Sequence, residues 1–513
     1  MTATVVRSWS AQQEIIFESF EHGRGHRVVR ARAGTGKTTT ILTGVSRAPE
    51  RSITLCAFGT RNKEDLETKL REQGIVSAVQ VQTIHAMGLG AVRRWWDRIR
   101  VQDKNAPVKR ADQLTEAVCG TQAPDKLKRL VSILHTKARE ITPHATEVGQ
   151  LTDLAYQFEC VPDDEWQQSG FDVAWLEKRA LEAMDLAAKR KPVSGIDFAD
   201  MIFLPVRNRW LRPAKDMVVV DEAQDMTEAQ LEIALGVCSG RVFIVGDDRQ
   251  GIFGFRGADS SSLDKLKARL HAEELGLTVT YRCGKAIVAL AKQLVPDFEA
   301  APSAPEGKVS TIPIERLALD VELGDFILSR KNAPLTSVAM SLIRQQKRVK
   351  VAGKDIGDGL ARIVDRLTKG KGKDSIPQVL DKLVHWEERE TARALAAGRE
   401  DQVEDVHDKA ETLRVLIDGV TGAPELLARI EGLFTDNGLG AAGIVTCSSV
   451  HKAKGLEADQ VFVLRDTLGQ GVGKKGKPLT PAQELEEQNI EYVAITRAKE
   501  SLVWVDGLPG ERA

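Results

Sequence analysis

The segment ARAGTGKT at 31–38 combines small residues, a lysine and hydroxyls in an order that suits phosphate binding. Small residues let backbone N–H groups close around phosphate oxygens at a helix N-terminus. Lys37 would reach the β- and γ-phosphates of ATP, and the Thr38 hydroxyl would bind Mg²⁺. The pattern therefore predicts a P-loop, although Ala31 replaces its usual first glycine. The residues expected to contact the nucleotide are Ala33, Gly34, Thr35, Gly36, Lys37, Thr38 and Thr39.

A second segment, VVVDEAQD at 218–225, places an acidic pair directly after an apolar run. Asp221 would hold Mg²⁺, and Glu222 would orient and deprotonate the water that attacks the γ-phosphate. Acidic residues at such a place can also simply cap a helix. Because a P-loop is present as well, the catalytic interpretation is favoured. The cofactors predicted from these two segments are ATP and Mg²⁺.

Strand-like apolar runs alternate with helical stretches in two parts of the chain. This alternation is typical of parallel sheets covered by helices, so we expect an α/β protein with two cores. Runs in the first core are VVRA (28–31), ITLCAF (53–58), MVVVDEA (217–223) and RVFIVGDD (241–248); those in the second are GDFILSR (324–330), RVKVAG (348–353), GIVTCSS (443–449) and DQVFVLRD (459–466).

Two mainly helical inserts interrupt these cores. About 185 residues separate the P-loop from the acidic pair, far more than a minimal P-loop domain needs. The intervening apolar residues recur at helical spacing. We therefore predict a first core at 1–94 and 196–278 with an insert at 95–195, and a second core at 279–353 and 441–513 with a smaller insert at 354–440.

The composition excludes several classes of protein. The 513 residues carry a net charge of -1, so any nucleic-acid groove must be a local feature. The 6 cysteines form no CxxC pair, which argues against a zinc site or an iron–sulfur cluster. No apolar run approaches the roughly 18 residues that span a bilayer, and the N-terminus lacks the pattern of a secretory signal. We expect a cytoplasmic protein without a membrane partner.

Five segments resemble, in order, the helicase motifs of UvrD-like superfamily 1 proteins, the group of UvrD, PcrA, Rep and RecB. The resemblance implies two RecA-like cores that close on ATP and carry an arginine finger in the second core. The segments are DEAQD (221–225), VGDDRQGIFGFRGAD (245–259), YRCG (281–284), SVHKAKGLE (449–457) and YVAITRAK (492–499).

The resemblance also implies roles in ATP chemistry. Charge that develops on the γ-phosphoryl oxygens requires cations around it. With Lys37 and Glu222, the implied catalytic residues are Gln250, Arg282 and Arg497. By resemblance, Gln13 recognises the adenine edge, Gln250 senses the γ-phosphate, Tyr281 stacks on adenine, Arg282 reaches the γ-phosphate, Glu457 contacts the ribose, and Arg497 is the arginine finger.

The same resemblance implies a groove for single-stranded DNA. Phe253 and Phe255 would stack on bases where relatives usually carry Tyr and Trp, and Arg256 would neutralise a phosphate. The alternative is that the two phenylalanines are core residues, and that the two histidines of the set are merely buried. Further groove positions are Phe58, Thr83 and His85 in the first core, and Arg330, Asn332, Ser449 and His451 in the second.

We therefore expect an ATP-dependent single-stranded DNA translocase or helicase that moves 3′ to 5′, with DNA repair among its possible settings. Motors of the opposite polarity, such as RecD and Dda, usually carry proline where this chain has GDDRQGIFGFRG. Two alternatives stay open. One is a nucleotide-switched subunit that binds DNA ends in a larger repair or anti-phage complex without unwinding them. The other is an RNA motor, since no residue evidently recognises a 2′-hydroxyl. The sequence names no protein partner.

Overall fold

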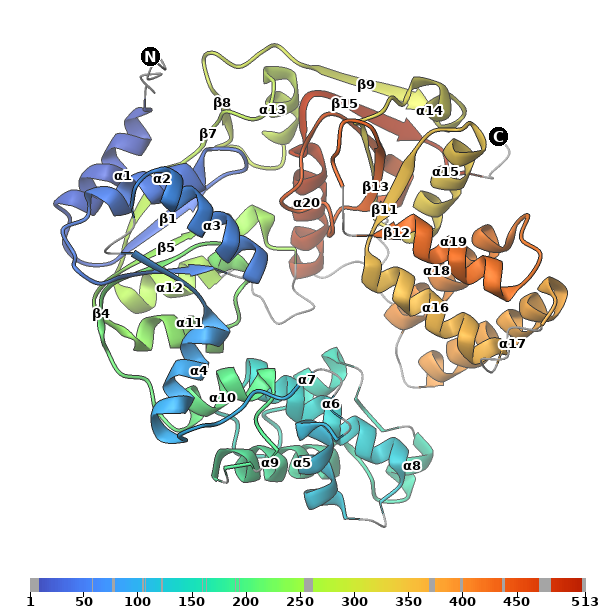
Figure 1. Ribbon diagram of the computed structural model, residues 1–513, viewed down its shortest axis with the longest axis horizontal. Helices are drawn as coiled ribbons and strands as arrows, with labels where there is room; N and C mark the ends of the chain where they lie inside the picture. The colour runs from blue at the N-terminus through green and yellow to red at the C-terminus, as the bar shows by residue number, and fades with distance from the viewer. Residues whose placement is uncertain are drawn as a thin grey trace. The chain divides into compact units, whose positions relative to one another are not determined.

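The chain divides into two compact units, which Figure 1 shows in a computed structural model. The first unit comprises Met1–Arg32 and Gly36–Leu277, and the second comprises Ala33–Thr35 and Thr278–Ala513. The residues described are 9–57, 59–75, 79–103, 106, 108–120, 123–158, 160–162, 164–189, 191–192, 194–252, 262–368, 374–396, 400–435, 439–469 and 481–509.

The first unit is built on a parallel sheet of six strands in the order β3-β2-β4-β5-β1-β6. The carboxyl ends of β4, β5 and β1 therefore lie side by side at one edge of this sheet. Segments that follow these three strands meet there, although they are far apart in the sequence. The strands are β1 (Arg27–Ala31), β2 (Ile53–Ala57), β3 (Val79–Thr83), β4 (Lys215–Val220), β5 (Cys238–Gly246) and β6 (Glu273–Leu277).

Helices cover both faces of the first sheet. Along β4, Met217 and Val219 belong to one buried cluster, whereas Val218 and Val220 belong to another, as the two-residue period of a strand requires. The first cluster includes side chains of α1 (Ala11–Glu21), α2 (Lys37–Arg47) and α3 (Thr60–Glu72). The second includes side chains of α4 (Ile84–Trp95), α10 (Phe198–Arg207), α11 (Glu228–Gly236) and α12 (Ser262–Leu270).

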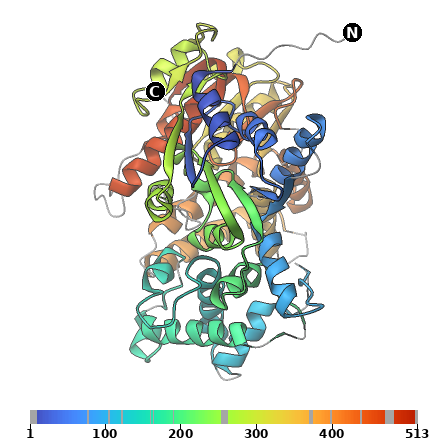
Figure 2. The ribbon, with the colours of Figure 1, turned by 90° about the vertical axis from the view of Figure 1, so that its left-hand side faces the viewer.

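The first insert forms a helical group beyond α4 and α10, which Figure 2 shows at the lower end of this unit. It has a hydrophobic cluster of its own, which includes Val131, Leu134, Ala180 and Met184. The inward faces of α4 and α10 contribute Val92 and Phe203 to that cluster and so join the insert to the sheet. The helices are α5 (Arg110–Cys119), α6 (Asp125–Ile141), α7 (Thr152–Gln157), α8 (Asp164–Gln168) and α9 (Val173–Lys189).

The second unit contains a parallel sheet of seven strands in the order β12-β11-β13-β10-β14-β15-β9. Two parallel sheets covered by helices confirm the predicted α/β class. A separate pair of short strands, β7 (Val279–Thr280) and β8 (Glu299–Ala300), also lies in this unit. The sheet strands are β9 (Lys308–Pro313), β10 (Phe326–Ser329), β11 (Val349–Ala352), β12 (Phe434–Thr435), β13 (Val445–Ser449), β14 (Ala458–Leu464) and β15 (Ala498–Asp506).

The second insert shares its hydrophobic core with the second sheet, unlike the first insert. One continuous cluster contains Ile327 of β10, Leu335 of α15, and Leu383 and Leu413 of the insert. This insert is therefore packed as an extension of its unit. The helices of the second unit are α13 (Lys285–Ala291), α14 (Ile314–Asp320), α15 (Asn332–Arg344), α16 (Lys354–Thr368), α17 (Ile376–Ala396), α18 (Glu400–Ile417), α19 (Ala423–Leu433) and α20 (Pro481–Ile495).

Within the described parts of both units, every helix is too short or too polar to span a membrane.

Candidate nucleotide and nucleic-acid sites

The predicted P-loop is a tight turn between β1 and α2. Gly34 and Gly36 adopt φ angles of +68° and +78°, a region that residues with a Cβ rarely occupy. A Cβ on Gly34 would lie 2.5 Å from the Cβ of Arg282, so this position also needs glycine for space. Gly36 directly precedes the first turn of α2, whose N–H groups are unpaired by the helix itself. The turn thus has the backbone geometry of an anion-binding loop.

Lys37 and the acidic pair lie together at the carboxyl edge of the first sheet. The Lys37 Nζ is 2.6 Å from a carboxylate oxygen of Glu222. Burial opposes the charge of Lys37, but the carboxylates of Glu222 and Asp221 outweigh it and raise the lysine pKa. Burial and the charge of Glu222 raise the pKa of Asp221 to about 6. Glu222 has a φ angle of +54°, unusual for a residue with a side chain, which aims its carboxylate from a sharp turn.

Asp247, which follows β5, is hydrogen-bonded to the segments that follow the two neighbouring strands, β1 and β4. Its carboxylate accepts hydrogen bonds from Arg32, at 2.9 Å, and from the Gln250 amide, at 2.8 Å. The side chain of Gln224 in turn accepts a bond from the Asp247 backbone N–H. Sequence reasoning did not single out Arg32 or Asp247. The signal that could have identified Arg32 is a large cation inside a loop of small residues.

The side chain of Gln13 makes two hydrogen bonds within the first unit. Its oxygen accepts from the Ser10 N–H at 3.0 Å, and its amide nitrogen donates to the Thr40 hydroxyl at 3.0 Å. Ser10 and Gln13 therefore form a capping box at the start of α1. Gln13 also packs next to the P-loop, because a Cβ on Gly36 would lie 3.5 Å from its amide nitrogen.

Three residues with predicted nucleotide roles gather at the amino edge of the second sheet. Glu457 precedes β14 and Arg497 precedes β15, and these strands are neighbours. The Arg282 Nε is 2.6 Å from a carboxylate oxygen of Glu457. Lys499 approaches the same carboxylate at 3.3 Å. The two cations outweigh burial and lower the pKa of Glu457.

The Arg497 side chain is 1% exposed and is held by its own unit. It donates to the backbone oxygens of Val493, at 3.0 Å, and Leu456, at 3.2 Å. Burial, together with the charge of Arg282, lowers the pKa of Arg497. In contrast, Tyr281 is 50% exposed, so its ring has surface available for stacking.

Of the groove positions predicted in the first unit, the structure describes Thr83 and His85. Thr83 caps α4 by accepting from the Ala86 N–H at 3.2 Å. The His85 ring lies 5.7 Å from the ring of Phe198, and burial lowers its pKa. The remaining predicted positions, Phe58, Phe253, Phe255 and Arg256, lie outside the described residues.

In the second unit, the predicted groove residues follow β10 and β13, which are neighbouring strands with Ser329 opposite Ser449. They lie at the carboxyl edge, opposite the edge that carries Arg282 and Glu457. Arg330 approaches Glu487 at 3.4 Å. The backbone and side-chain nitrogens of Asn332 both donate to Asp408 of the insert. His451 is partly exposed.

The residues expected to bind Mg²⁺ have suitable chemistry. Thr38 offers a hydroxyl from the first turn of α2, and one carboxylate oxygen of Asp221 accepts from the Glu222 N–H at 2.9 Å. Mg²⁺ prefers oxygen ligands and is usually held by one or two carboxylates together with substrate phosphates. Among the described residues no cluster of three or more His, Cys, Asp or Glu could hold a metal. A site completed by phosphate oxygens fits this donor set.

The family model of the UvrD/REP helicase N-terminal domain matches residues 9–271, more than half of the chain. The chain belongs to the UvrD/REP helicase family. The model of the UvrD-like helicase C-terminal domain matches residues 426–505 in addition. The resemblance stated from the motifs is thereby confirmed, and the two matched regions include the P-loop, the acidic pair and the final motif.

Several DNA helicases are similar to this chain over long stretches. F-box DNA helicase 1 of Gallus gallus is 27% identical over 57% of this chain and 29% of its own length. F-box DNA helicase protein 1 of Schizosaccharomyces pombe is 23% identical over 93% of this chain and 55% of its own length. ATP-dependent DNA helicase UvrD2 of Mycobacterium tuberculosis is 25% identical over 93% of this chain and 76% of its own length. The chain thus spans about half or less of the two F-box relatives.

Proposed function

We propose that this protein is an ATP-dependent motor that moves along single-stranded DNA in the 3′-to-5′ direction. The observation that carries the proposal is the arrangement of Lys37, Asp221 and Glu222 where β1 and β4 end. A cation, a metal-ligand carboxylate and a base are the groups that phosphoryl transfer to water requires. The three similar proteins described above are all named as DNA helicases, which supports DNA as the track.

The proposed chemistry assigns one task to each group. The N–H groups of the P-loop and Lys37 bind the phosphates of ATP. Glu222 accepts a proton from the attacking water, and Gln250, held by Asp247, orients the γ-phosphate. Arg282 and Arg497 supply positive charge to the developing negative charge on the phosphoryl oxygens. Thr38 and Asp221 would hold Mg²⁺, which neutralises phosphate charge when it is bound.

In each unit, a side chain proposed to bind phosphate is held in a salt bridge that ATP would have to break. Lys37 is paired with Glu222, and Arg282 is paired with Glu457. Phosphates would draw the two cations away from these carboxylates. Glu222 would then accept a proton from water, and Glu457 would bind the ribose hydroxyls. Nucleotide binding thus converts two resting salt bridges into the reactive arrangement.

The experiment that tests this function is the steady-state rate of ATP hydrolysis in four conditions: no nucleic acid, single-stranded DNA, duplex DNA and single-stranded RNA. Glu222→Gln provides the blank. We expect strong stimulation by single-stranded DNA and a rate about 10² to 10⁴ times lower in the variant. Slow hydrolysis that no nucleic acid stimulates would instead identify a nucleotide-switched subunit. Stimulation by RNA alone would identify an RNA motor.

A further inference from the structure

A basic and aromatic surface lies at the amino edge of the first sheet, opposite the candidate nucleotide site. The chain at 93–100 is RRWWDRIR, and the chain at 207–215 is RNRWLRPAK. These two segments hold seven arginines, a lysine and three tryptophans but only one acidic residue. The whole chain has a net charge of -1, so positive charge is concentrated here. Neither segment is part of the predicted groove or of the proposed ATP chemistry.

The tertiary structure joins the two segments through their tryptophans. The rings of Trp95 and Trp210 are stacked, with centroids 5.8 Å apart and planes 18° apart. Trp96 meets Trp210 edge-on at 5.1 Å, and the guanidinium carbon of Arg212 is 5.6 Å from the Trp95 ring centroid. Trp95 nevertheless remains 51% exposed. An exposed indole beside guanidinium groups is an arrangement suited to a negatively charged, aromatic ligand.

A hollow lined in part by residues 98–100 of the first segment extends the positive surface. Its volume is about 410 Å³, and Arg98, Arg100 and Lys191 line it. The Arg98 side chain is 94% exposed and lies 3.5 Å from Asp97, which is 89% exposed. Such an exposed pair is weak, so a phosphate can replace Asp97 as the partner of Arg98. We use the name tryptophan surface for the set Trp95, Arg98, Arg100, Lys191, Trp210 and Arg212.

Helix α4 connects the tryptophan surface with the predicted groove. Thr83 and His85 lie at its start, and Trp95 is its last residue. Twelve helical residues span about 18 Å, so the two sites are separate but within reach of one strand. Figures 1 and 2 show α4 running from the sheet toward the helical insert.

We propose that the tryptophan surface is a second binding site for single-stranded DNA, which holds the strand beyond the groove. Unpaired bases can stack on the exposed indole, whereas bases inside a duplex are already stacked on each other. Arg212, beside the indole, and the exposed Arg98 of the same surface would pair with adjoining phosphates. The proposal rests on the proposed function for the groove, but the binding at the tryptophan surface itself needs no ATP.

The test measures the binding of labelled oligothymidylates, without ATP, by fluorescence anisotropy. A strand of about 8 nucleotides occupies the groove alone, and one of about 30 nucleotides also reaches the tryptophan surface. Trp95→Ala should weaken the binding of the long strand about tenfold and leave the short strand unchanged. Replacing both Arg98 and Arg212 by Ala should reduce the slope of log K against log salt by about 1.4 for the long strand. These two arginines are exposed, so this variant does not depend on tolerance of a tryptophan change.

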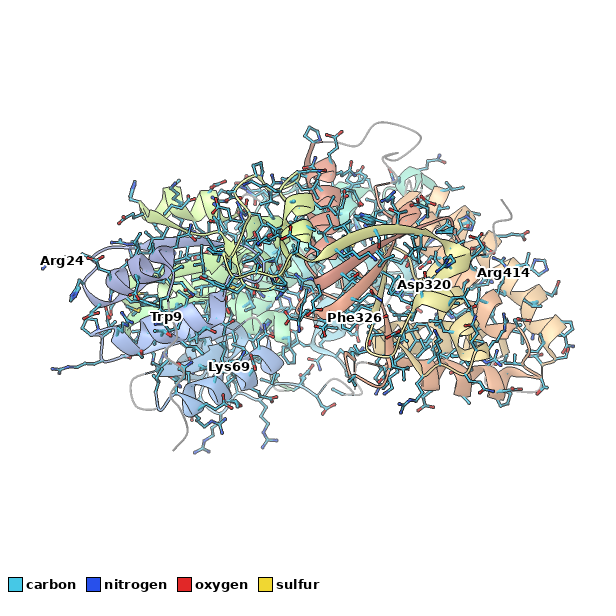
Figure 3. The ribbon with its side chains drawn as sticks, turned by 90° about the horizontal axis from the view of Figure 1, so that it is seen from above. Trp9, Arg24, Lys69, Asp320, Phe326 and Arg414 are labelled. Carbon is cyan, nitrogen blue, oxygen red and sulfur yellow. The ribbon has the colours of Figure 1, made fainter. Side chains whose placement is uncertain are left out.

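Two further variants separate binding from general effects of substitution. Arg24→Ala removes one positive charge from the exposed turn between α1 and β1, labelled in Figure 3, and should bind both strands as the unaltered protein does. Asp97→Asn removes the one acidic residue of the two segments and should tighten binding of the long strand. A gain of affinity cannot result from damage to the fold.

The proposal is overturned if the long strand binds the Trp95 and arginine variants as tightly as the unaltered protein. It is also overturned if the variants lose affinity equally for both lengths, or if they lose affinity for duplex DNA but not for single strands. If the unaltered protein binds no single strand of either length, the proposed function itself fails. The two failures are therefore distinguishable.

Discussion

At the residue scale, two side chains proposed to bind phosphate, Lys37 and Arg282, form salt bridges with carboxylates of their own unit. Lys37 and Glu222 are 2.6 Å apart in the first unit, as are Arg282 and Glu457 in the second. Each pair keeps a partly buried charge compensated before a nucleotide arrives. Lys37 and Glu222 were predicted from the P-loop and the acidic pair, and Arg282 and Glu457 from the family resemblance. The sequence could not predict which carboxylate pairs with which cation, because the pairing depends on the order of the strands in each sheet.

Substitutions of the two partners in the first pair should affect ATP binding and ATP turnover differently. Lys37→Ala should abolish both, since the lysine contacts the phosphates. Glu222→Gln should retain ATP binding but lower kcat by about 10² to 10⁴, because it removes only the general base. Binding of a fluorescent ATP analogue and steady-state hydrolysis measure the two effects. Lys189→Ala, on the exposed face of α9, is the matched control. Near-normal turnover in both site variants would refute the assignment.

Gln13 has two candidate roles, a structural cap and a contact with adenine, and Gln13→Glu distinguishes them. Glutamate preserves the capping box with Ser10 but loses the amide donor. If Gln13 recognises adenine, KM for ATP should rise about five- to tenfold, and the preference for ATP over GTP should fall. If Gln13 only caps α1 and holds Thr40, KM can change through the loss of the Thr40 hydrogen bond, but the preference for ATP over GTP will stay as it is. Hydrolysis rates with each nucleotide supply the measurement.

At the element scale, most buried strands were predictable from the sequence, whereas several edge strands and the interior strand β15 were not. Every apolar run of the two cores corresponds to a strand, for example β4 and β14. The strands β3 and β9 at the sheet edges were missed. Polar residues interrupt their apolar ones, so neither strand contains an apolar run. β6 carries only five residues, of which Leu277 alone is buried. Edge strands are defined by their neighbour in the sheet, which the local sequence does not reveal.

The first insert contains buried charges that the sequence did not indicate. Arg139 of α6 is fully buried and donates to Asp197, at 2.8 Å, and Asp200, at 2.7 Å. Arg110 of α5 donates to Asp200 at 3.1 Å. This network ties α5 and α6 to the start of α10. Nearby, His135 is held between the Thr115 hydroxyl and the Ala111 carbonyl oxygen.

His135 should make the stability of the protein depend on pH. Burial, with the charge of Arg139, lowers the pKa of His135 to about 3. In the unfolded chain the ordinary pKa is about 6.5, so the unfolded state gains a proton first and stability falls below that pH. Between pH 7 and pH 5 the loss should be about 2 kcal/mol. Urea unfolding at both pH values, compared with His135→Gln, isolates this effect. An identical pH dependence in the two proteins would contradict it.

At the scale of the whole molecule, order along the chain and arrangement in space carry different information. The ordered motifs identified the family, and the two family models confirm it. Only the topology shows that β5 lies between β1 and β4, which brings Asp247 and Arg32 into the candidate site. Similarly, the tryptophan surface combines segments more than a hundred residues apart. Such combinations depend on strand order and helix packing, so motif spacing cannot predict them.

The central claim is directional movement on single-stranded DNA, and displacement of streptavidin from biotinylated oligonucleotides tests it most directly. With ATP, the protein should displace streptavidin from the 5′ end much faster than from the 3′ end, since a motor moving 3′ to 5′ arrives at the 5′ end. Glu222→Gln should displace neither. Displacement from the 3′ end alone would contradict the proposed polarity. ATP hydrolysis that displaces streptavidin from neither end would contradict the motor itself.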